Sequence, residues 1–157
     1  MIYTKDCAEN VKSLKISDCP PPNSVITKLD AFMSILEEIL DSIPPIQQPM
    51  RFGNKAFRIW HDRLAIETEF FLIDILPPAI SNSSVEISPY ILDMFGNTTR
   101  IDYGTGHELN FVILIYLLLK LKIIERSDLP AAILVGFVSY IKVMRKLQTV
   151  YMLEPAG

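Results

Sequence analysis

The densest grouping of side chains that could do chemistry lies in the stretch FGNTTRIDYGTGHE, residues 95–108. It combines a guanidinium, a carboxylate pair, an imidazole and a phenol, and three glycines punctuate it at Gly96, Gly104 and Gly106. Loops normally lie at the surface, and a loop this rich in polar groups is typical of a binding or catalytic site. The first question is therefore which ligand these groups would suit.

An anion is the ligand that the local physics favours. The stretch runs directly into the apolar segment LNFVILIYLLLKL, which predicts a helix beginning near Gly106. The N–H groups of a first helical turn lack intrahelical partners and carry the positive end of the helix dipole. Gly104 and Gly106 would allow positive φ and close approach of a ligand, and Arg100 would add a bidentate contact. Residues 100–106 are thus predicted to bind phosphate or carboxylate.

Other interpretations of the same stretch stay open. Thr105 and Glu108 have the spacing of a capping box, so the stretch also fits an exposed loop before a well-capped helix. It is not a P-loop, because no Gly-Lys-Ser/Thr follows, and no strand precedes it as a dinucleotide fingerprint requires. Asp102, His107 and Glu108 lack the histidine pair or cysteine company of a metal centre, so no metal site is predicted.

The stretch FGNTTRIDYGTGHE resembles the signature of the phosphotyrosyl phosphatase activator family, the activators of protein phosphatase 2A. Two further blocks are similar to the same family in the same order: RFGNKAFRIWHDRL at residues 51–64 and MRKLQTVYMLEPAG at residues 144–157. The resemblance extends from about Ser24 to the last residue. From the residues alone, Arg51 and Arg58 are candidate ligand contacts and His61 a candidate base, although all three also suit surface or helix–helix contacts.

The resemblance implies a function as well as a fold. Members of the family are all-helical, bind ATP with magnesium, and promote the active, metal-loaded form of the phosphatase catalytic subunit. A peptidyl-prolyl cis/trans isomerase activity is also attributed to them. The implied partners are the phosphatase 2A catalytic subunit, its scaffold subunit and a proline-containing peptide, with no nucleic acid and no membrane. The implied location is the cytoplasm and also the nucleus.

The resemblance also assigns residues. The nucleotide-contacting positions of the signature correspond to Arg100, Thr105 and Gly106, with Gly104 beside them. A second set matches the same motif and would shape either the nucleotide pocket or the catalytic peptide site; sequence spacing gives its members no separate roles. That set is Asp102, Tyr103, His107 and Glu108.

The chain departs from the family pattern at its end. In the family, the segment similar to LEPAG continues into a Gly- and Asp-rich block that supplies magnesium and further nucleotide contacts, whereas this sequence stops at Gly157. The expectation is an N-terminal fragment, a short isoform or a truncated product that lacks half of the nucleotide site. The alternative function is a non-catalytic helical interaction domain that has lost nucleotide binding.

Composition sets further bounds. The net charge of −3 and the mixture of acidic and basic residues do not suit a nucleic-acid binder. Cys7 and Cys19 lack metal-ligand spacing and are expected to be free thiols. Because charged residues are spread through the first 20 positions, no signal peptide is expected there. The apolar run 111–119 is far short of the roughly 20 residues of a membrane span.

The apolar spacing predicts an all-α fold. Residues 1–23 are expected to be a mobile arm, and residues 24–157 one helical domain with no strand pattern longer than four residues. Apolar positions three and four apart, ended by Pro-Pro pairs, mark amphipathic helices. Further caps are predicted from a capping box at 83–86 and from Ser127 or Asp128. The predicted helices span residues 24–43, 54–76, 84–95, 106–123 and 129–151.

One expectation concerns the surface. Hydrophobic residues make up 50% of the chain and the mean hydropathy is +0.28, which is high for a small domain. We expect an exposed apolar patch beside the polar stretch, and self-association of the chain through it. The residues expected to contribute are Ile113, Tyr116, Leu117, Phe137 and Tyr140.

Overall fold

The computed structural model describes residues 21–156, and most of the predicted N-terminal arm lies outside that range. The fold is all-α, as predicted. The main helices are α2 (Ser24–Ser42), α3 (Ala56–Ile75), α4 (Ser84–Asp93), α5 (Thr105–Lys120) and α7 (Val138–Val150), with contacts between α2 and α3, α2 and α7, α3 and α4, and α4 and α5. Shorter helical turns are η2 (Pro78–Ser83), η3 (Arg126–Asp128), α6 (Leu129–Ala131) and η4 (Ala132–Phe137), and the strands are β1 (Asp102–Tyr103) and β2 (Glu154–Pro155).

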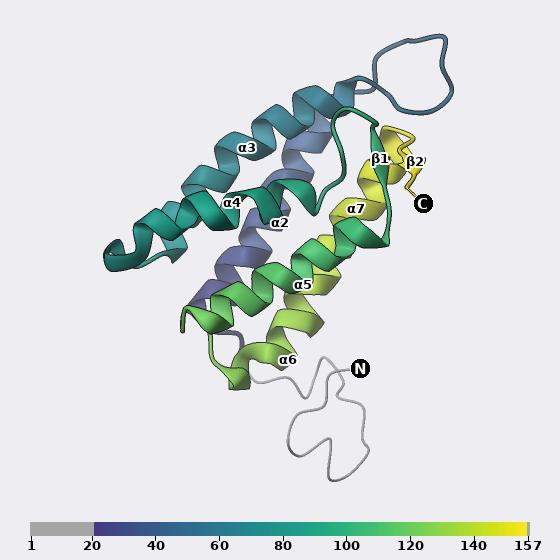
Figure 1. Cartoon of the computed structure of the whole chain (residues 1–157). Helices are drawn as coiled ribbons and strands as arrows, with labels where there is room; N and C mark the ends of the chain where they lie inside the picture. The colour runs from purple at the N-terminus through teal and green to yellow at the C-terminus, as the bar shows by residue number, and fades with distance from the viewer. Residues whose placement is uncertain (1–20, 157) are drawn as a thin grey trace, which may run out of the picture.

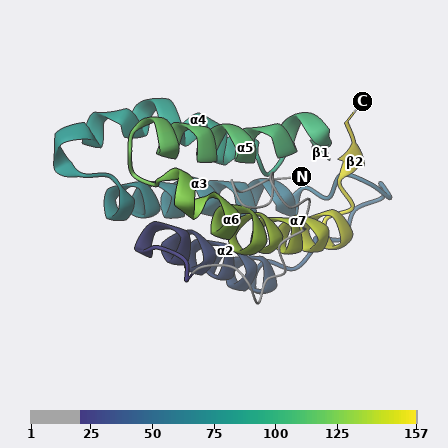
Figure 2. The same cartoon turned by 90° about the horizontal axis from the view of Figure 1, so that it is seen from below.

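The helices form a layered bundle. Figure 2 shows α4 and α5 along one side, α2 along the other, and α3 and α7 between them. Trp60 lies fully buried in α3, where its indole N–H donates to the Leu36 carbonyl of α2 at 3.2 Å. Phe95 packs edge-on against both Trp60 and Tyr140, so one aromatic core joins α3, α7 and the start of the polar stretch. Aromatic pairs of this kind add to the stability gained from area burial.

The last long helix is not uniform. The predicted helix 129–151 exists as a continuous helical run, but Ala132–Phe137 within it is π-helical. A π turn adds one residue, so it rotates the buried face of everything before it relative to everything after it. After the π-helical segment, Tyr140, Met144 and Leu147 are buried as predicted, whereas within it Gly136 is buried and the predicted Ile133 and Leu134 are only half-buried.

The predicted cap at Asp128 is wrong in its details. Its carboxylate accepts from the Glu125 backbone N–H and from the Asn23 side chain at 2.7 Å, and it caps η3 rather than α6. Asn23 in turn caps α2 by accepting from the Ile26 N–H. The two helix starts are therefore tied together by side chains from distant parts of the sequence.

Two other predicted caps are also wrong. Helix α5 begins at Thr105, one residue earlier than predicted, with Gly104 at the N-cap, and no side-chain cap bond forms there among the described residues. Thr105 is inside the helix, so the Thr105–Glu108 capping box has no geometry in which to form. Ser83 likewise makes no cap bond within residues 21–156, because η2 runs straight into α4 and gives Ser83 helical φ and ψ.

A small parallel sheet, absent from the predictions, positions the polar stretch. β1 pairs with β2 in the register Asp102↔Glu154, and the Ala156 N–H donates to the Tyr103 carbonyl. Nearby, the Gly53 and Asn54 N–H groups donate to the carbonyls of Met152 and Tyr151. The end of the chain thus runs beside the polar stretch and the loop before α3, as Figure 1 shows.

One helical run passes a length-and-composition test for a membrane span. It is Arg126–Val150, of which 39% of the relevant window is buried. Core helices of soluble proteins pass the same test. Lys142 and Lys146 on this run pair with Glu37 of α2, at 2.7 and 3.4 Å. The predicted absence of a membrane partner stays a prediction.

Candidate functional site

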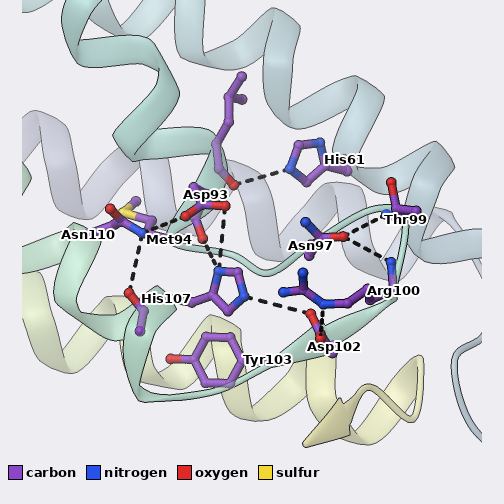
Figure 3. Close-up of polar contacts among 12 residues, drawn as sticks. His61, Asp93, Met94, Asn97, Thr99, Arg100, Asp102, Tyr103, His107 and Asn110 are labelled. Carbon is purple, nitrogen blue, oxygen red and sulfur yellow. Dashed lines mark hydrogen bonds and ion pairs between the residues drawn. The ribbon is translucent and has the colours of Figure 1, made fainter. Parts of the chain in front are cut away.

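The polar stretch folds into a tight loop built around Asn97, drawn in Figure 3. The Asn97 side-chain oxygen accepts from the backbone N–H groups of Thr99 and Arg100, and its backbone carbonyl accepts from Ile101. Ile101 has a φ of +53°, a left-handed conformation that is an outlier for a β-branched residue. This turn presents Arg100 and Asp102 on the same side of the loop (Figure 3).

Arg100 and Asp102 form the central charge pair of the loop. The Arg100 Nε donates to Asp102 Oδ2 at 2.5 Å, and this bond raises the pKa of Arg100. The Arg100 side chain is 62% exposed, so the remaining guanidinium N–H groups face solvent. The other carboxylate oxygen, Asp102 Oδ1, is buried and has no hydrogen-bond partner in residues 21–156. A buried carboxylate oxygen without a hydrogen-bond donor lowers the stability of the fold, so this oxygen could accept a hydrogen bond from a ligand.

The His107 ring lies close to that oxygen. Its Nδ1 donates to the Asp93 backbone carbonyl at 2.6 Å, and its Nε2 lies 3.8 Å from Asp102 Oδ1. His107 is 7% exposed and stacks on the ring of Tyr103. Asp102 and His107, predicted from sequence as candidate catalytic groups, are therefore brought together, in a largely desolvated position.

Tyr103 is turned toward the core. Its hydroxyl lies 2.9 Å from that of Tyr140, which donates to the Met94 carbonyl at 2.6 Å. Burial raises the pKa of both phenols, and the neighbouring Glu108 carboxylate adds to that shift. Both phenols are therefore neutral hydrogen-bonding groups, and Tyr103 anchors the loop to α7.

The two glycines of the motif differ. Neither Gly104 nor Gly106 has the positive φ that the sequence analysis allowed them. Gly104 is extended, with φ of −167°, and a Cβ there would lie 2.4 Å from the Ala156 carbonyl oxygen. The absence of a side chain at Gly104 therefore makes room for the backbone of Ala156 and not for a ligand. A Cβ at Gly106 would meet no described atom within 4 Å. Open space therefore lies over the first turn of α5 at Gly106.

The first turn of α5 has the features of an anion site. The backbone N–H groups of Thr105 and Gly106 have no backbone acceptor in the described part of the chain. Both residues are exposed, and the free side of Arg100 belongs to the same loop. Free N–H groups, the helix dipole and a guanidinium together form the donor set that phosphate prefers. The described residues contain no cluster of three His, Cys, Asp or Glu side chains able to hold a metal ion.

The second predicted block meets the same loop. Arg58 of α3 donates to the carbonyls of Thr98 and Thr99, at 2.9 and 3.2 Å. His61 Nε2 lies 3.1 Å from the Leu92 carbonyl, and burial lowers the pKa of its imidazole. Both residues therefore make contacts between elements, in line with the helix-contact interpretation of this block. Arg51 is exposed and lies over the ring of Phe52.

The sequence analysis did not predict Asp93 or Asn110 as site residues, and it gave Asn97 no role of its own. Asp93 ends α4 and Asn110 lies in α5, and the Asn110 amide donates to Asp93 Oδ2 at 2.8 Å. With Asn97 and His61 they line a cavity of about 380 Å³. Asn97 lay within the polar stretch, but its structural role depends on the fold of the loop. No spacing in the sequence links Asp93 to Asn110.

Comparison with known proteins agrees with the motif blocks. The sequence model of the family described as "Phosphotyrosyl phosphate activator (PTPA) protein" matches residues 1–157. The chain belongs to the PTPA family. Among its curated relatives, the "Probable serine/threonine-protein phosphatase 2A activator 1" of Dictyostelium discoideum is 40% identical over 98% of this chain. The "Serine/threonine-protein phosphatase 2A activator" of Drosophila melanogaster is 36% identical over 99% of it.

A solved PTPA structure has the same fold. The crystal structure of the PP2A phosphatase activator Ypa1 PTPA1 superposes with a TM-score of 0.73 and 32% identity, over 90% of this chain. The chain spans 48% of that structure, and 49% and 39% of the Dictyostelium and Drosophila relatives. It thus corresponds to about half of the length of these PTPA proteins.

Proposed function

We propose that this chain carries the phosphate-binding half of an ATP-dependent activator of protein phosphatase 2A. The carrying observation is that the stretch 95–108 supplies both an exposed guanidinium, Arg100, and an open first helical turn at Thr105 and Gly106. The relatives' names support the phosphatase as partner, since the Dictyostelium and Drosophila proteins are both named as activators of phosphatase 2A. We propose in addition that activation of the phosphatase depends on ATP and magnesium.

The roles of the residues follow from the geometry of the loop. Arg100 and the N–H groups of Thr105 and Gly106 would hold the phosphates, while Gly104 and Tyr103 hold the loop against the rest of the fold. ATP would supply the anionic phosphates and bring its own magnesium. Asp102 fixes the Arg100 side chain, so its carboxylate positions the guanidinium.

Calorimetric titration with ATP and magnesium tests the nucleotide site. We expect sub-millimolar binding that Arg100→Ala abolishes, because the guanidinium is the only side-chain cation that the loop 95–108 contains. Arg126→Ala, an exposed arginine in η3 outside this loop, is the matched control and should bind as the natural chain does. No heat of binding in the natural chain would leave the non-catalytic interaction domain as the better description.

Phosphatase activation is tested separately. The chain is mixed with the phosphatase 2A catalytic subunit, and complex formation and serine/threonine phosphatase activity are measured with and without ATP and magnesium. Association with a rise in activity supports the proposal. Binding without a rise in activity would indicate an interaction domain, and no association at all would contradict the partner assignment for this chain.

Peptidyl-prolyl isomerisation is a second candidate function. The reaction needs no covalent catalyst, only a desolvated site that favours the twisted imide over the planar forms, against a barrier of ~18–20 kcal/mol. The observation in its favour is the buried Asp102–His107 pair with an unpaired carboxylate oxygen beside the exposed loop. A protease-coupled assay on proline peptides tests it; Asp102→Asn should lower the rate and Asp62→Asn should not. A natural-chain rate equal to background would count against it.

A further inference from the structure

The cavity between α3, α4, α5 and the loop is distinct from the exposed phosphate-binding face. It has a volume of about 380 Å³, within the range of small-ligand pockets. Its polar lining comes from four elements: His61 of α3, Tyr90 and Asp93 of α4, Asn97 of the loop and Asn110 of α5. Because each wall belongs to a different packed element, the pocket is preformed by the fold.

The charge in this pocket is negative. Asp93 supplies a carboxylate whose side chain is 55% exposed, and the residues that line the pocket include no lysine or arginine in the described structure. His61 adds no competing positive charge near pH 7, because burial lowers the pKa of its imidazole. Within residues 21–156, no lysine or arginine lies within salt-bridge distance of Asp93, although the Arg100 guanidinium of the neighbouring loop is close enough for Asp93 to add to the raised pKa of Arg100.

The polar atoms nearest Asp93 are acceptors, while the Asn97 amide N–H₂ and the Tyr90 hydroxyl also offer donors to the pocket, since the Asn97 oxygen already accepts from Thr99 and Arg100. The Asn110 amide N–H₂ is used on Asp93 Oδ2, which leaves its carbonyl oxygen available. His61 spends its Nε2 proton on the Leu92 carbonyl, so the neutral ring keeps Nδ1 as an acceptor. The His107 Nδ1 donates its proton to the Asp93 backbone carbonyl, and the same nitrogen lies 3.7 Å from Asp93 Oδ1. The Asp93 carboxylate thus has acceptor capacity that the described chain does not fill.

We propose that this pocket binds a guanidinium or ammonium group, presented either by a basic side chain of a partner protein or by a free organic cation. Such a group has donors and no acceptors, which complements a carboxylate, an amide oxygen and a neutral imidazole. Tyr90 adds an aromatic ring to the lining, and aromatic rings attract cations. The proposal does not rest on nucleotide binding or on phosphatase activation.

A nuclear magnetic resonance titration of the dilute, isotope-labelled chain tests the proposal. The probe is N-acetyl-arginine N-methylamide, and the control ligand is the citrulline analogue, which has nearly the same shape without the charge. We expect saturable shifts of the Asp93, Asn97 and Thr98 amide signals with the arginine compound, and affinity for the citrulline compound at least about tenfold weaker. Equal affinity for both compounds, or no saturable shift with either, would overturn the proposal.

Two variants and one further ligand sharpen the result. Asp93→Asn keeps the shape and the Asn110 contact but removes the charge, so it should lose the preference for arginine. Asp62→Asn, an exposed carboxylate next to His61 that does not line the pocket, should keep it. An unchanged preference in Asp93→Asn would contradict the assignment. N-propylguanidine, a singly charged guanidinium compound without a peptide group, separates the two sources: binding equal to that of the arginine compound indicates a free cation, and weaker binding indicates a protein side chain.

Discussion

Gly104 and Gly106 lie two positions apart in the sequence, and their surroundings are opposite. A Cβ at Gly104 would lie 2.4 Å from the Ala156 carbonyl oxygen, a contact with backbone that cannot move aside without disturbing the β1–β2 pairing. We therefore expect Gly104→Ala to lower the free energy of unfolding by about 1–3 kcal/mol, as overpacking does. Denaturant unfolding followed by circular dichroism measures the change.

Gly106→Ala is the matched control for that prediction. The site is open, and alanine is a better helix former than glycine, so the variant should be as stable as the natural chain or about 0.5–1 kcal/mol more stable. A Gly104→Ala variant that unfolds at the same denaturant concentration as Gly106→Ala would show that the end of the chain does not press on Gly104.

His61 gives the fold a pH dependence of known sign. Burial lowers its pKa in the folded chain below the ordinary value of 6.5, so the unfolded chain binds the proton more readily. The free energy of unfolding is then highest above pH 6.5 and falls as the pH drops through 6.5 toward the lowered folded pKa. His61→Gln, which can still donate to the Leu92 carbonyl, should show a flatter dependence in this window. Unfolding curves at several pH values compare the two, and parallel pH profiles would contradict the assignment to His61.

At the scale of single residues, the sequence identified the loop 95–108 but not all of the residues that hydrogen-bond to it. Arg100, Asp102 and His107 were predicted as site residues from the resemblance to the family signature, and Arg100 also as an anion contact; the structure brings them together. Asp93 and Asn110 were not predicted, since a carboxylate at a helix end and an asparagine in an apolar helix have ordinary local explanations. Only the crossing of α4 and α5 makes them neighbours.

At the scale of elements, helix periodicity predicted more than capping patterns did. The existence and order of the main helices follow from apolar spacing and Pro-Pro stops, which are local. The caps failed where tertiary contacts decided the helix start: Gly104 is held by β2, and Ser83 continues a preceding helical turn. The π turn at Ala132–Phe137 also has no local signature, and there the Gly136 Cα lies close to Leu29 of α2, since an added Cβ would be 3.1 Å from that side chain.

Asn54 closes the loop between α2 and α3. Its side-chain oxygen accepts from the N–H groups of Ile46 and Ala56, and its amide donates to the Ile46 carbonyl at 2.8 Å. Asn54 is 8% exposed, so Asn54→Ala would leave the buried Ala56 N–H without a partner and free the part-buried Ile46 groups, at a cost of about 1–3 kcal/mol. Chemical denaturation measures it, with Gln47→Ala in the exposed part of the same loop as control. Equal losses in the two variants would show that the Asn54 contacts do not hold the loop.

At the scale of the molecule, exposed apolar side chains were predicted, but only some of the residues named for that surface are exposed. Tyr116 is 58% exposed as expected, whereas Tyr140 is fully buried because its hydroxyl bonds to Tyr103 and Met94 inside the bundle. The most exposed apolar side chains of α5 are instead Leu109, Val112 and Tyr116. Their spacing of three and four residues places them on one face of the helix.

This face of α5 leads to a prediction about association. Leu109, Val112 and Tyr116 are each more than half exposed, and a contiguous apolar face of this kind favours contact with another protein surface. We expect chains of residues 1–157 to self-associate through it, and the variant Leu109→Gln/Val112→Gln/Tyr116→Gln to sediment closer to the 17.8 kDa of one chain. Analytical ultracentrifugation over a range of concentrations measures the mass.

Val85→Gln, a highly exposed apolar residue in α4, should leave the association unchanged. A natural chain that stays monomeric at all concentrations would show that this face alone does not drive association, and association that survives the triple substitution would point to the exposed residues Ile66, Phe70 and Ile73 of α3 instead.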